Sequence, residues 1–173
     1  MTSAITPDEV DRIVAAWRRE RSDLDVSPLE VFSRVSRLSR FLDLARKSAF
    51  AAAGLEGWEF DVLSALRRSG APYQLTAGSL VRQTLVSSGT MTNRIDRLLK
   101  RGLVARNASL HDRRAVLIDL TPAGHDLIDA AMDALVAHEQ ELLADLSSED
   151  QAHLAGLLRS LVSPFDQPGN EPS

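Results

Sequence analysis

The chain has no cysteine, few aromatic residues and no long hydrophobic run. Without cysteine it can form neither disulfides nor thiolate metal sites, and it cannot sense oxidants through a thiol. Because no run of about 18 apolar residues is present, no segment is predicted to cross a membrane. The first ten residues, MTSAITPDEV, are acidic and lack an apolar signal core, so we expect a cytoplasmic protein.

The net charge is small, but the charged residues are strongly segregated along the chain. The net charge is −4, which at face value disfavours a nucleic-acid partner. Residues 87–114, however, contain seven Lys or Arg and two Asp, a local charge of +5, whereas residues 121–173 contain one Arg and ten Asp or Glu, or −9. Since binding to phosphates depends on cations at the contact and not on the chain total, the basic segment is a candidate for DNA binding. We expect the acidic end to face away from DNA.

The basic segment begins with a predicted amphipathic helix. Ser87 or Ser88 can cap its N-terminus, and Gly102 stands where a left-handed residue ends a helix. One face is apolar, with residues at helical spacing: Met91, Ile95, Leu98 and Leu99. The opposite face is polar and suited to bases and phosphates in a major groove: Thr90, Asn93, Arg97 and Lys100.

Two β-prone runs follow the helix, at 103–105 and 115–118, and the polar residues 107–114 lie between them. This pattern predicts a hairpin with a charged tip. A short helix over about 76–85 precedes the basic helix, which makes a helix-turn-helix pair. A charged helix alone is more often a solvated surface, but helix, strand, basic loop and strand in this order are typical of a winged helix.

The run from Asp112-Arg113-Arg114 through Leu120-Thr121 to Gly124 resembles the wing signature of the MarR family of bacterial transcription regulators. The upstream run TNRIDRL, residues 92–98, is similar to the recognition helix of that family. The resemblance implies a mainly α fold, a winged helix-turn-helix with a small β-hairpin wing and long N- and C-terminal dimerisation helices. It also implies a homodimer that binds double-stranded DNA, in the bacterial cytoplasm and at the nucleoid when bound.

Residue by residue, the predicted DNA contacts come from the helix and the wing. They are Ser87, Ser88, Thr90, Thr92, Asn93, Arg97, Lys100, Arg113 and Arg114. Asp112 and Arg114 could form a salt bridge that shapes the hairpin, while Arg113 or Arg114 could enter a minor groove. We expect both.

The remaining helices are predicted from caps and periodicity. One domain is expected over residues 1–173, with a DNA-binding lobe at 55–120, dimerisation helices at 1–53 and 121–165, and a tail at 166–173. Thr6 is expected to cap a first helix at 7–21, and Ser27 with Glu30 forms a predicted capping box for a buried axial helix at 28–53. Further helices are expected at 57–69, after Thr121-Pro122 as far as about Leu143, and from Ser147 or Ser148 to Pro164.

Trp17, Asp61, Arg94 and Arg106 resemble a ligand-binding set of the urate-responsive branch of the same family. Guanidinium groups bind planar anions in a bidentate manner, and an indole stacks or donates its N–H. The resemblance implies a small anionic or phenolic ligand in a cleft between the DNA-binding lobe and the dimer helices. The alternative is a surface Asp–Arg pair with a packed indole.

The sequence thus predicts a sequence-specific transcription regulator. The favoured function is that of a repressor, which a small ligand releases from a palindromic operator. Two alternatives remain: a DNA-binding regulator without an effector, and a winged helix used for protein interaction. His111-Asp112 has no accompanying nucleophile, so no catalytic residue and no enzyme activity are predicted. The four histidines never stand three or four residues apart, so no metal or other cofactor is predicted.

Overall fold

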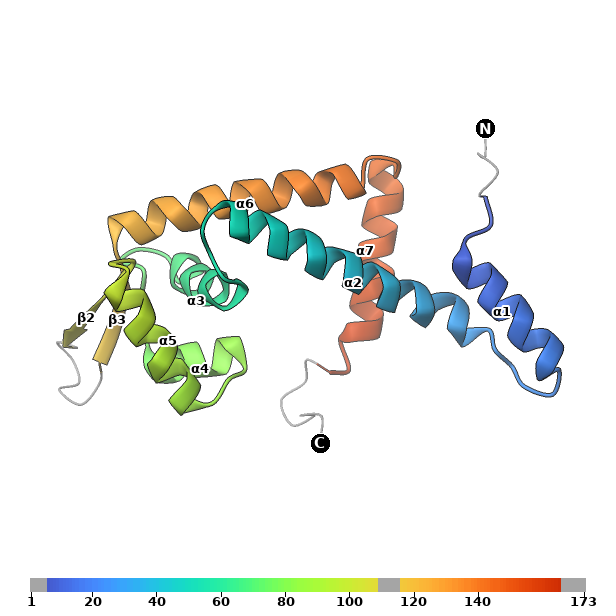
Figure 1. Cartoon of the computed structure of the whole chain (residues 1–173), viewed down its shortest axis with the longest axis horizontal. Coiled ribbons are helices and arrows are strands. Elements are labelled where there is room, and N and C mark those ends of the chain that lie inside the picture. The colour runs from blue at the N-terminus through green and yellow to red at the C-terminus, as the bar shows by residue number, and fades with distance from the viewer. Residues whose placement is uncertain (1–5, 109–115, 166–173) are drawn as a thin grey trace. The chain divides into compact units, whose positions relative to one another are not determined.

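The computed structural model describes residues 6–108 and 116–165, which form helices and one three-stranded antiparallel sheet (Figure 1). The prediction of a mainly helical fold with a small β element is confirmed. The chain divides into two compact units, Met1–Val62 and Leu63–Ser173. The boundary falls inside α3 (Gly57–Arg68), so one helix contributes to both units.

In the first unit, α1 (Glu9–Glu20) contacts the N-terminal half of α2 (Pro28–Ala52). Val10, Val14 and Val26 are buried together at this contact. Arg34 of α2 reaches Asp8 at 2.8 Å and Asp11 at 2.8 Å, and so ties α2 to the start of α1. These bonds hold the pKa of the Asp8 carboxyl at about 2, mainly because the Arg34 guanidinium stabilises its charged form.

Two predicted helix caps are wrong. Helix α1 is capped by Asp8 and not by Thr6, because Asp8 and Asp11 each accept the backbone N–H of the other in a capping box. Ser27 has helical backbone angles and makes no side-chain cap bond, so the expected Ser27–Glu30 box does not form. The Glu30 carboxylate instead accepts a hydrogen bond from the Arg18 guanidinium of α1 at 2.5 Å. Gly54, with φ +68°, follows the end of α2 in the left-handed conformation that suits glycine.

Helix α2 is not buried in the described chain as the periodicity predicts. Among its described residues only Phe50 is buried, whereas Phe41 and Leu44 are each 59% exposed. The periodic spacing of apolar residues correctly predicts a helix with an apolar face. Most of that face is not in contact with any other described part of this chain.

The second unit contains the helix-turn-helix pair and the sheet. α4 (Ala77–Thr84) and α5 (Ser88–Lys100) follow a short strand, β1 (Gln74–Thr76). β1 pairs with β3 (Val116–Leu120), and β3 pairs with β2 (Val104–Ala108), in the order β1-β3-β2. The two hairpin strands occur where they are predicted, but β2 extends further than predicted and includes Asn107 and Ala108 of the predicted tip. Strand β1 is not predicted, because three residues directly before a helix carry no strand periodicity.

The core of this unit gathers side chains from the helices and the sheet. The buried side chains come from three helices already named, from β3 and from the next helix, α6 (Pro122–Leu142): Leu66, Leu80, Ile95, Leu98, Ile118 and Ile128. Arg67 of α3 donates to both carboxylate oxygens of Asp129 in α6, at 2.8 and 3.1 Å. This partly buried contact lowers the pKa of Asp129, because the Arg67 guanidinium stabilises its charged form, and it links the two helices.

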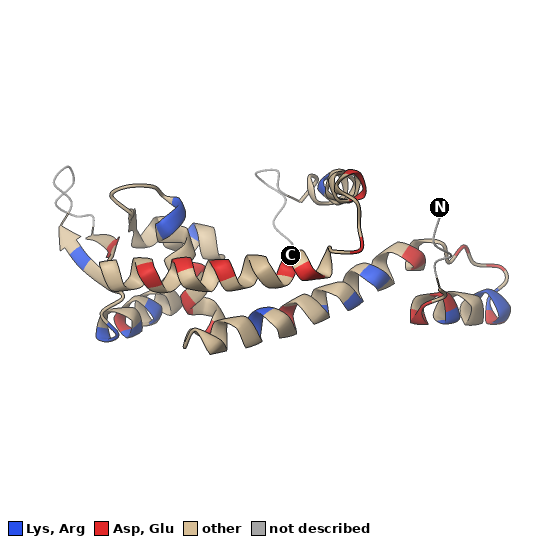
Figure 2. Cartoon of the chain, turned by 90° about the horizontal axis from the view of Figure 1, so that it is seen from above, with Lys and Arg blue, Asp and Glu red and all other residues tan. Residues whose placement is uncertain are grey.

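The C-terminal helices are α6 (Pro122–Leu142) and α7 (Ser148–Val162), with Thr121 and Ser147 as the N-caps that the sequence predicts. Helix α6 carries five Asp or Glu and no Lys or Arg, and the acids appear as red bands in Figure 2. Helix α7 has no buried residue. Within the described residues, no helix is long and apolar enough to cross a membrane.

Candidate DNA-binding surface and ligand pocket

Helix α5 is fixed to the core by one face. Ser87 caps it by accepting the backbone N–H of Thr90 at 3.2 Å, and Gly102 beyond its C-terminus has φ +69°. Met91, Ile95 and Leu98 are buried. Leu85, with φ 52°, forms the turn from α4. The orientation of α5 is therefore set by packing on one side and by caps at both ends.

The opposite face of α5 is exposed along its length. Its exposed side chains are the predicted DNA contacts Ser87, Ser88, Thr90, Thr92, Asn93, Arg97 and Lys100. The Thr92 hydroxyl donates to the Ser88 carbonyl at 3.0 Å, and the Ser87 and Thr90 hydroxyls lie 2.9 Å apart. This face can present hydroxyls, an amide and cations to a groove, and the individual contacts with DNA stay predictions.

The two strands that flank the tip of the predicted wing pair with each other. β2 and β3 pair in an antiparallel register from Val104 opposite Leu120 to Ala108 opposite Val116. Asp112, Arg113 and Arg114 lie outside the described residues, and the predicted Asp112–Arg114 salt bridge therefore stays a prediction.

The four predicted ligand residues fall in both units. Arg106 of β2 donates to Asp96 of α5 at 2.8 Å, so its guanidinium binds a carboxylate within its own unit. Arg94 is half-buried beside the apolar face of α5, as its helical position predicts. Trp17 and Asp61 belong to the first unit, where Trp17 lies on an exposed groove of α1 and Asp61 lines a different pocket. The four-residue site stays a prediction.

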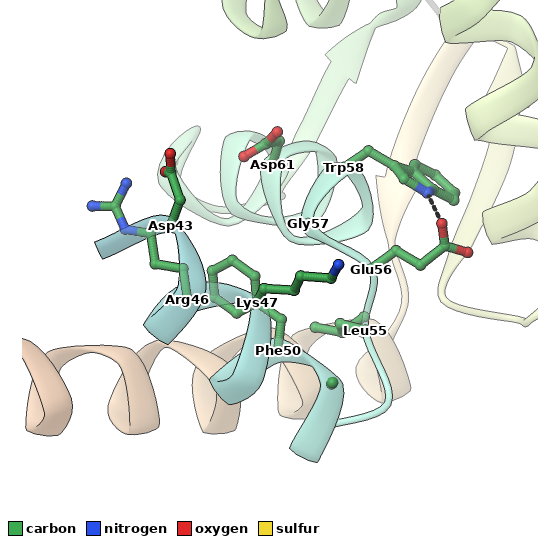
Figure 3. Close-up of a pocket in the computed structure, with 10 residues that line it drawn as sticks. Asp43, Arg46, Lys47, Phe50, Leu55, Glu56, Gly57, Trp58 and Asp61 are labelled. Atoms are coloured by element: carbon green, nitrogen blue, oxygen red, sulfur yellow. Dashed lines mark hydrogen bonds between the residues drawn. The ribbon is translucent and has the colours of Figure 1, made fainter. Parts of the chain in front are cut away.

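The Asp61 pocket is formed by the C-terminal half of α2, the turn after it and the first half of α3 (Figure 3). Its volume is about 590 Å³. The sequence reasoning missed its two cations, Arg46 and Lys47, which stand one turn before the buried Phe50. A cationic pair next to an aromatic residue near a helix end was the only signal, and it is common on solvated helices.

Comparison with known proteins places the chain in a family. Residues 53–115 match the family model described as MarR family. The chain is 40% identical over 150 residues to the HTH-type transcriptional regulator PecS of Dickeya dadantii (strain 3937), and the match covers 87% of this chain and 90% of that protein.

Two solved structures share its fold. A MarR mutant from E. coli complexed with operator DNA has a TM-score of 0.65 at 24% identity, covering 80% of this chain and 96% of that one. NadR in complex with 4-hydroxyphenylacetate has a TM-score of 0.61 at 22% identity, covering 73% and 88%. The family match, the extended similarity to PecS and the helix-turn-helix with its hairpin agree, and the chain belongs to the MarR family of transcription regulators.

Proposed function

We propose that this protein is a homodimeric repressor that binds a palindromic operator through α5 and the wing and is released by a small anionic or phenolic ligand. The observation that carries the DNA-binding part is the exposed polar face of α5 on a helix whose other face is buried. A structural relative, the MarR mutant, was solved as a complex with operator DNA, which supports the same use of this fold. An interaction module would have no need for this set of groove-binding side chains.

The two DNA-binding elements have different roles in this proposal. Asn93 and Arg97 read base edges, because amide and guanidinium groups recognise them in a bidentate manner. Arg113 and Arg114 contribute charge at phosphates or in a minor groove, which is largely independent of base sequence. The acidic helix α6 would be repelled by the DNA phosphates, so in this proposal it faces away from them.

The experiment is a fluorescence-anisotropy titration of duplexes that cover the promoter next to the gene, at several salt concentrations. Asn93→Ala or Arg97→Ala should reduce the preference for the operator by about 1–3 kcal/mol for each base contact removed. Arg113→Ala should weaken operator and random DNA alike and lower the salt slope by about 0.9 for each phosphate that is no longer neutralised. Arg159→Ala, which removes a cation from the acidic segment, is the control and should change neither quantity. Identical effects of the helix and wing variants would refute the division of roles.

The homodimer is supported by apolar side chains that the described chain leaves exposed. They occur on α1, α2 and α7, and Trp17, Phe41 and Leu157 are examples from each helix. A monomer rarely leaves so many apolar side chains on adjacent helix turns in water. A two-fold dimer places two copies of α5 on one face of DNA, about 34 Å apart. Sedimentation as a monomer at micromolar concentration would contradict this arrangement.

Ligand release is proposed to act through Trp17, Asp61, Arg94 and Arg106. An anionic ligand beside Arg94 would repel the Asp61 carboxylate and break its pairing with an arginine. The candidate partner is Arg106, which would have to exchange its bond to Asp96 for one to Asp61. Within one chain, Arg18 binds Glu30 near the start of α2, whereas Asp61 lies by Arg46, about 24 Å further along the helix at 1.5 Å per residue. Trp17 of the second copy is therefore the better candidate for a cleft with Asp61.

NadR was solved in complex with 4-hydroxyphenylacetate, which makes this phenolic acid a rational first ligand to test. Bound ligand should weaken operator binding by roughly 5- to 150-fold, the usual size of such coupling. Asp61→Asn should keep ligand binding but reduce release, whereas Arg94→Ala should abolish ligand binding. Operator binding that is unchanged by any anionic or phenolic compound would favour the regulator without an effector. We also propose that the protein acts in the bacterial cytoplasm, at the nucleoid when bound, and has no enzymatic activity.

A further inference from the structure

We propose that Arg106 is a positioning residue of the DNA-binding surface, which holds the Asp96 carboxylate toward the hairpin and thereby leaves Lys100 free to bind a DNA phosphate. The inference rests on the proposed DNA-binding function but adds a residue that acts without touching DNA itself. It concerns the pair that the structure shows, in which the Arg106 guanidinium donates to Asp96 at 2.8 Å. All three residues lie in the second unit.

Helix α5 carries one acid among its basic residues. Asp96 is the only Asp or Glu of the helix, which also contains Arg94, Arg97 and Lys100. Lys100 stands four residues after Asp96, a spacing at which two side chains of a helix are neighbours. The acid precedes the lysine, which is the more favourable order for an ion pair. Without another partner, Asp96 is therefore expected to pair with Lys100.

Strand β2 contacts α5 and supplies the competing cation (Figure 1). Val104 and Arg106 stand two residues apart on β2 and so lie on the same side of the strand, where Val104 is buried. Arg106 pairs in register with Ile118, which is also buried. The Arg106 side chain thus leaves the sheet on its core side, and its guanidinium reaches Asp96 of the helix packed there.

The pair is better suited to orienting a carboxylate than to stabilising the fold. The side chains of Arg106 and Asp96 are 43% and 46% exposed, and an ion pair so exposed adds little to stability, because water and salt screen it. The guanidinium is nevertheless a planar fork presented by a paired strand, whereas Lys100 would have to order a long, flexible side chain. Among the described residues, Asp96 accordingly pairs with Arg106 and not with Lys100.

This choice of partner decides how many cations α5 offers to DNA. Lys100 is exposed on the polar face that also carries Asn93 and Arg97. There its ammonium group can neutralise a phosphate and release a counterion. If Asp96 paired with Lys100 instead, the two charges would cancel and this phosphate contact would be lost. Arg106 therefore acts on DNA binding through Lys100.

The test uses the full-length protein without ligand and measures binding to the promoter duplex and to a random duplex by fluorescence anisotropy at several salt concentrations. Arg106→Met removes the cation but keeps much of the side-chain length, Arg106→Lys keeps the charge, and Asp96→Asn removes the acid. The double variant Asp96→Asn/Arg106→Met shows whether the effect of Arg106 passes through Asp96. Arg12→Met is the matched control, because Arg12 also pairs with a carboxylate, that of Glu9 at 3.1 Å, but on the exposed surface of α1.

Arg106→Met should weaken binding to both duplexes by roughly tenfold, the size of one lost charge-assisted hydrogen bond. It should also lower the salt slope by about 0.9, the value for one phosphate contact. Adding Asp96→Asn should restore the affinity to within about twofold of wild type, because nothing then competes for Lys100. In a Lys100→Met background, Arg106→Met should have no further effect.

The remaining variants show that the effect is specific. Arg106→Lys should weaken binding less than Arg106→Met, and Arg12→Met should bind both duplexes as wild type does. A failure to fold could not be repaired by a second substitution at Asp96, so the recovery in the double variant separates positioning from a structural role.

Two results would overturn the inference. If Arg106→Met bound both duplexes as tightly as wild type while Arg97→Ala still reduced the preference for the promoter, Arg106 would have no positioning role and the DNA-binding function would stand. If Arg106→Met caused an equal loss with and without Asp96→Asn, Arg106 would bind DNA directly or support the fold. A wild-type protein that bound neither duplex would instead refute the proposed function on which the inference rests.

Discussion

Gly124→Ala is expected to destabilise the protein, although alanine is the better helix former. Gly124 lies in the first turn of α6, where an added Cβ would stand 2.1 Å from the Leu103 carbonyl oxygen and 2.9 Å from Cδ1 of Leu120. Leu103 cannot retreat freely, because its carbonyl accepts the backbone N–H of Thr121 at 3.2 Å. The substitution therefore forces the start of α6 away from the strand β2, at the point where the hairpin joins the helix.

Two opposing contributions decide the sign of the change. In an unobstructed helix, replacing glycine by alanine stabilises by up to about 1 kcal/mol. Overpacking typically costs about 1–3 kcal/mol, and here the nearest atom belongs to the backbone and not to a flexible side chain. Because a backbone atom cannot easily give way, we take the upper part of the overpacking range, about 2–3 kcal/mol. Subtracting the gain of about 1 kcal/mol leaves a net decrease of about 1–2 kcal/mol in the free energy of unfolding.

Urea unfolding followed by circular dichroism measures this decrease, at one fixed protein concentration because a dimer adds a concentration dependence. Gly156→Ala in α7 is the matched control, since an added Cβ there meets nothing within 4 Å. That variant should gain roughly 0.5–1 kcal/mol. If Gly124→Ala were as stable as wild type or stabilised like Gly156→Ala, the close approach of α6 to Leu103 would be refuted.

Two further predictions concern carboxylates whose pKa is lowered by an arginine. In an NMR titration the Asp8 carboxyl should show a pKa of about 2. Arg34→Met should move this pKa toward the ordinary value of 3.8, and an unchanged pKa in that variant would contradict the contact. For Asp129, whose pKa Arg67 lowers, the stabilisation is present above the unfolded-state pKa and disappears as the pH falls through the lowered folded-state value. Asp129→Asn should therefore be less stable than wild type at pH 7, and the difference should shrink in acid below about pH 3.8; an equal difference at both pH values would refute the pair.

Local signals predicted much of the DNA-binding lobe. The Ser87 cap, the apolar residues of α5, Gly102 and Thr121-Pro122 all act within a few residues along the chain, and the structure confirms them. The two wrong caps show the limit of the same reasoning. Threonine, aspartate and serine are all common N-cap residues, and they stand here at positions 6, 8 and 27. Which of them caps a helix depends on whether its side-chain oxygen faces an unpaired backbone N–H at the helix start. For Asp8 the Arg34 contact from a distant helix contributes to that geometry.

Features that depend on pairing between distant segments were not predictable. Strand β1 is three residues long and exists because Leu75 lies opposite Ile118, more than forty positions later. The lining of the Asp61 pocket likewise comes together only because the turn after α2 brings the first half of α3 beside the end of α2. In the sequence, Arg46 and Lys47 look like any exposed basic pair on a helix.

The exposed apolar side chains of α2 and α7 show why periodicity predicts a face but not what covers it. In α2 they alternate with five cations and two acids, a net charge of +3, whereas α6 has five acids and no cation, or −5. Apolar area supplies most of the energy of an interface, and opposite charge around it favours the correct orientation over others. A second copy of the chain presents both kinds of surface at once, so a two-fold contact can join each basic helix to an acidic one. The same segregation of charge that leaves α5 basic thus also gives α2 and α6 charges of opposite sign.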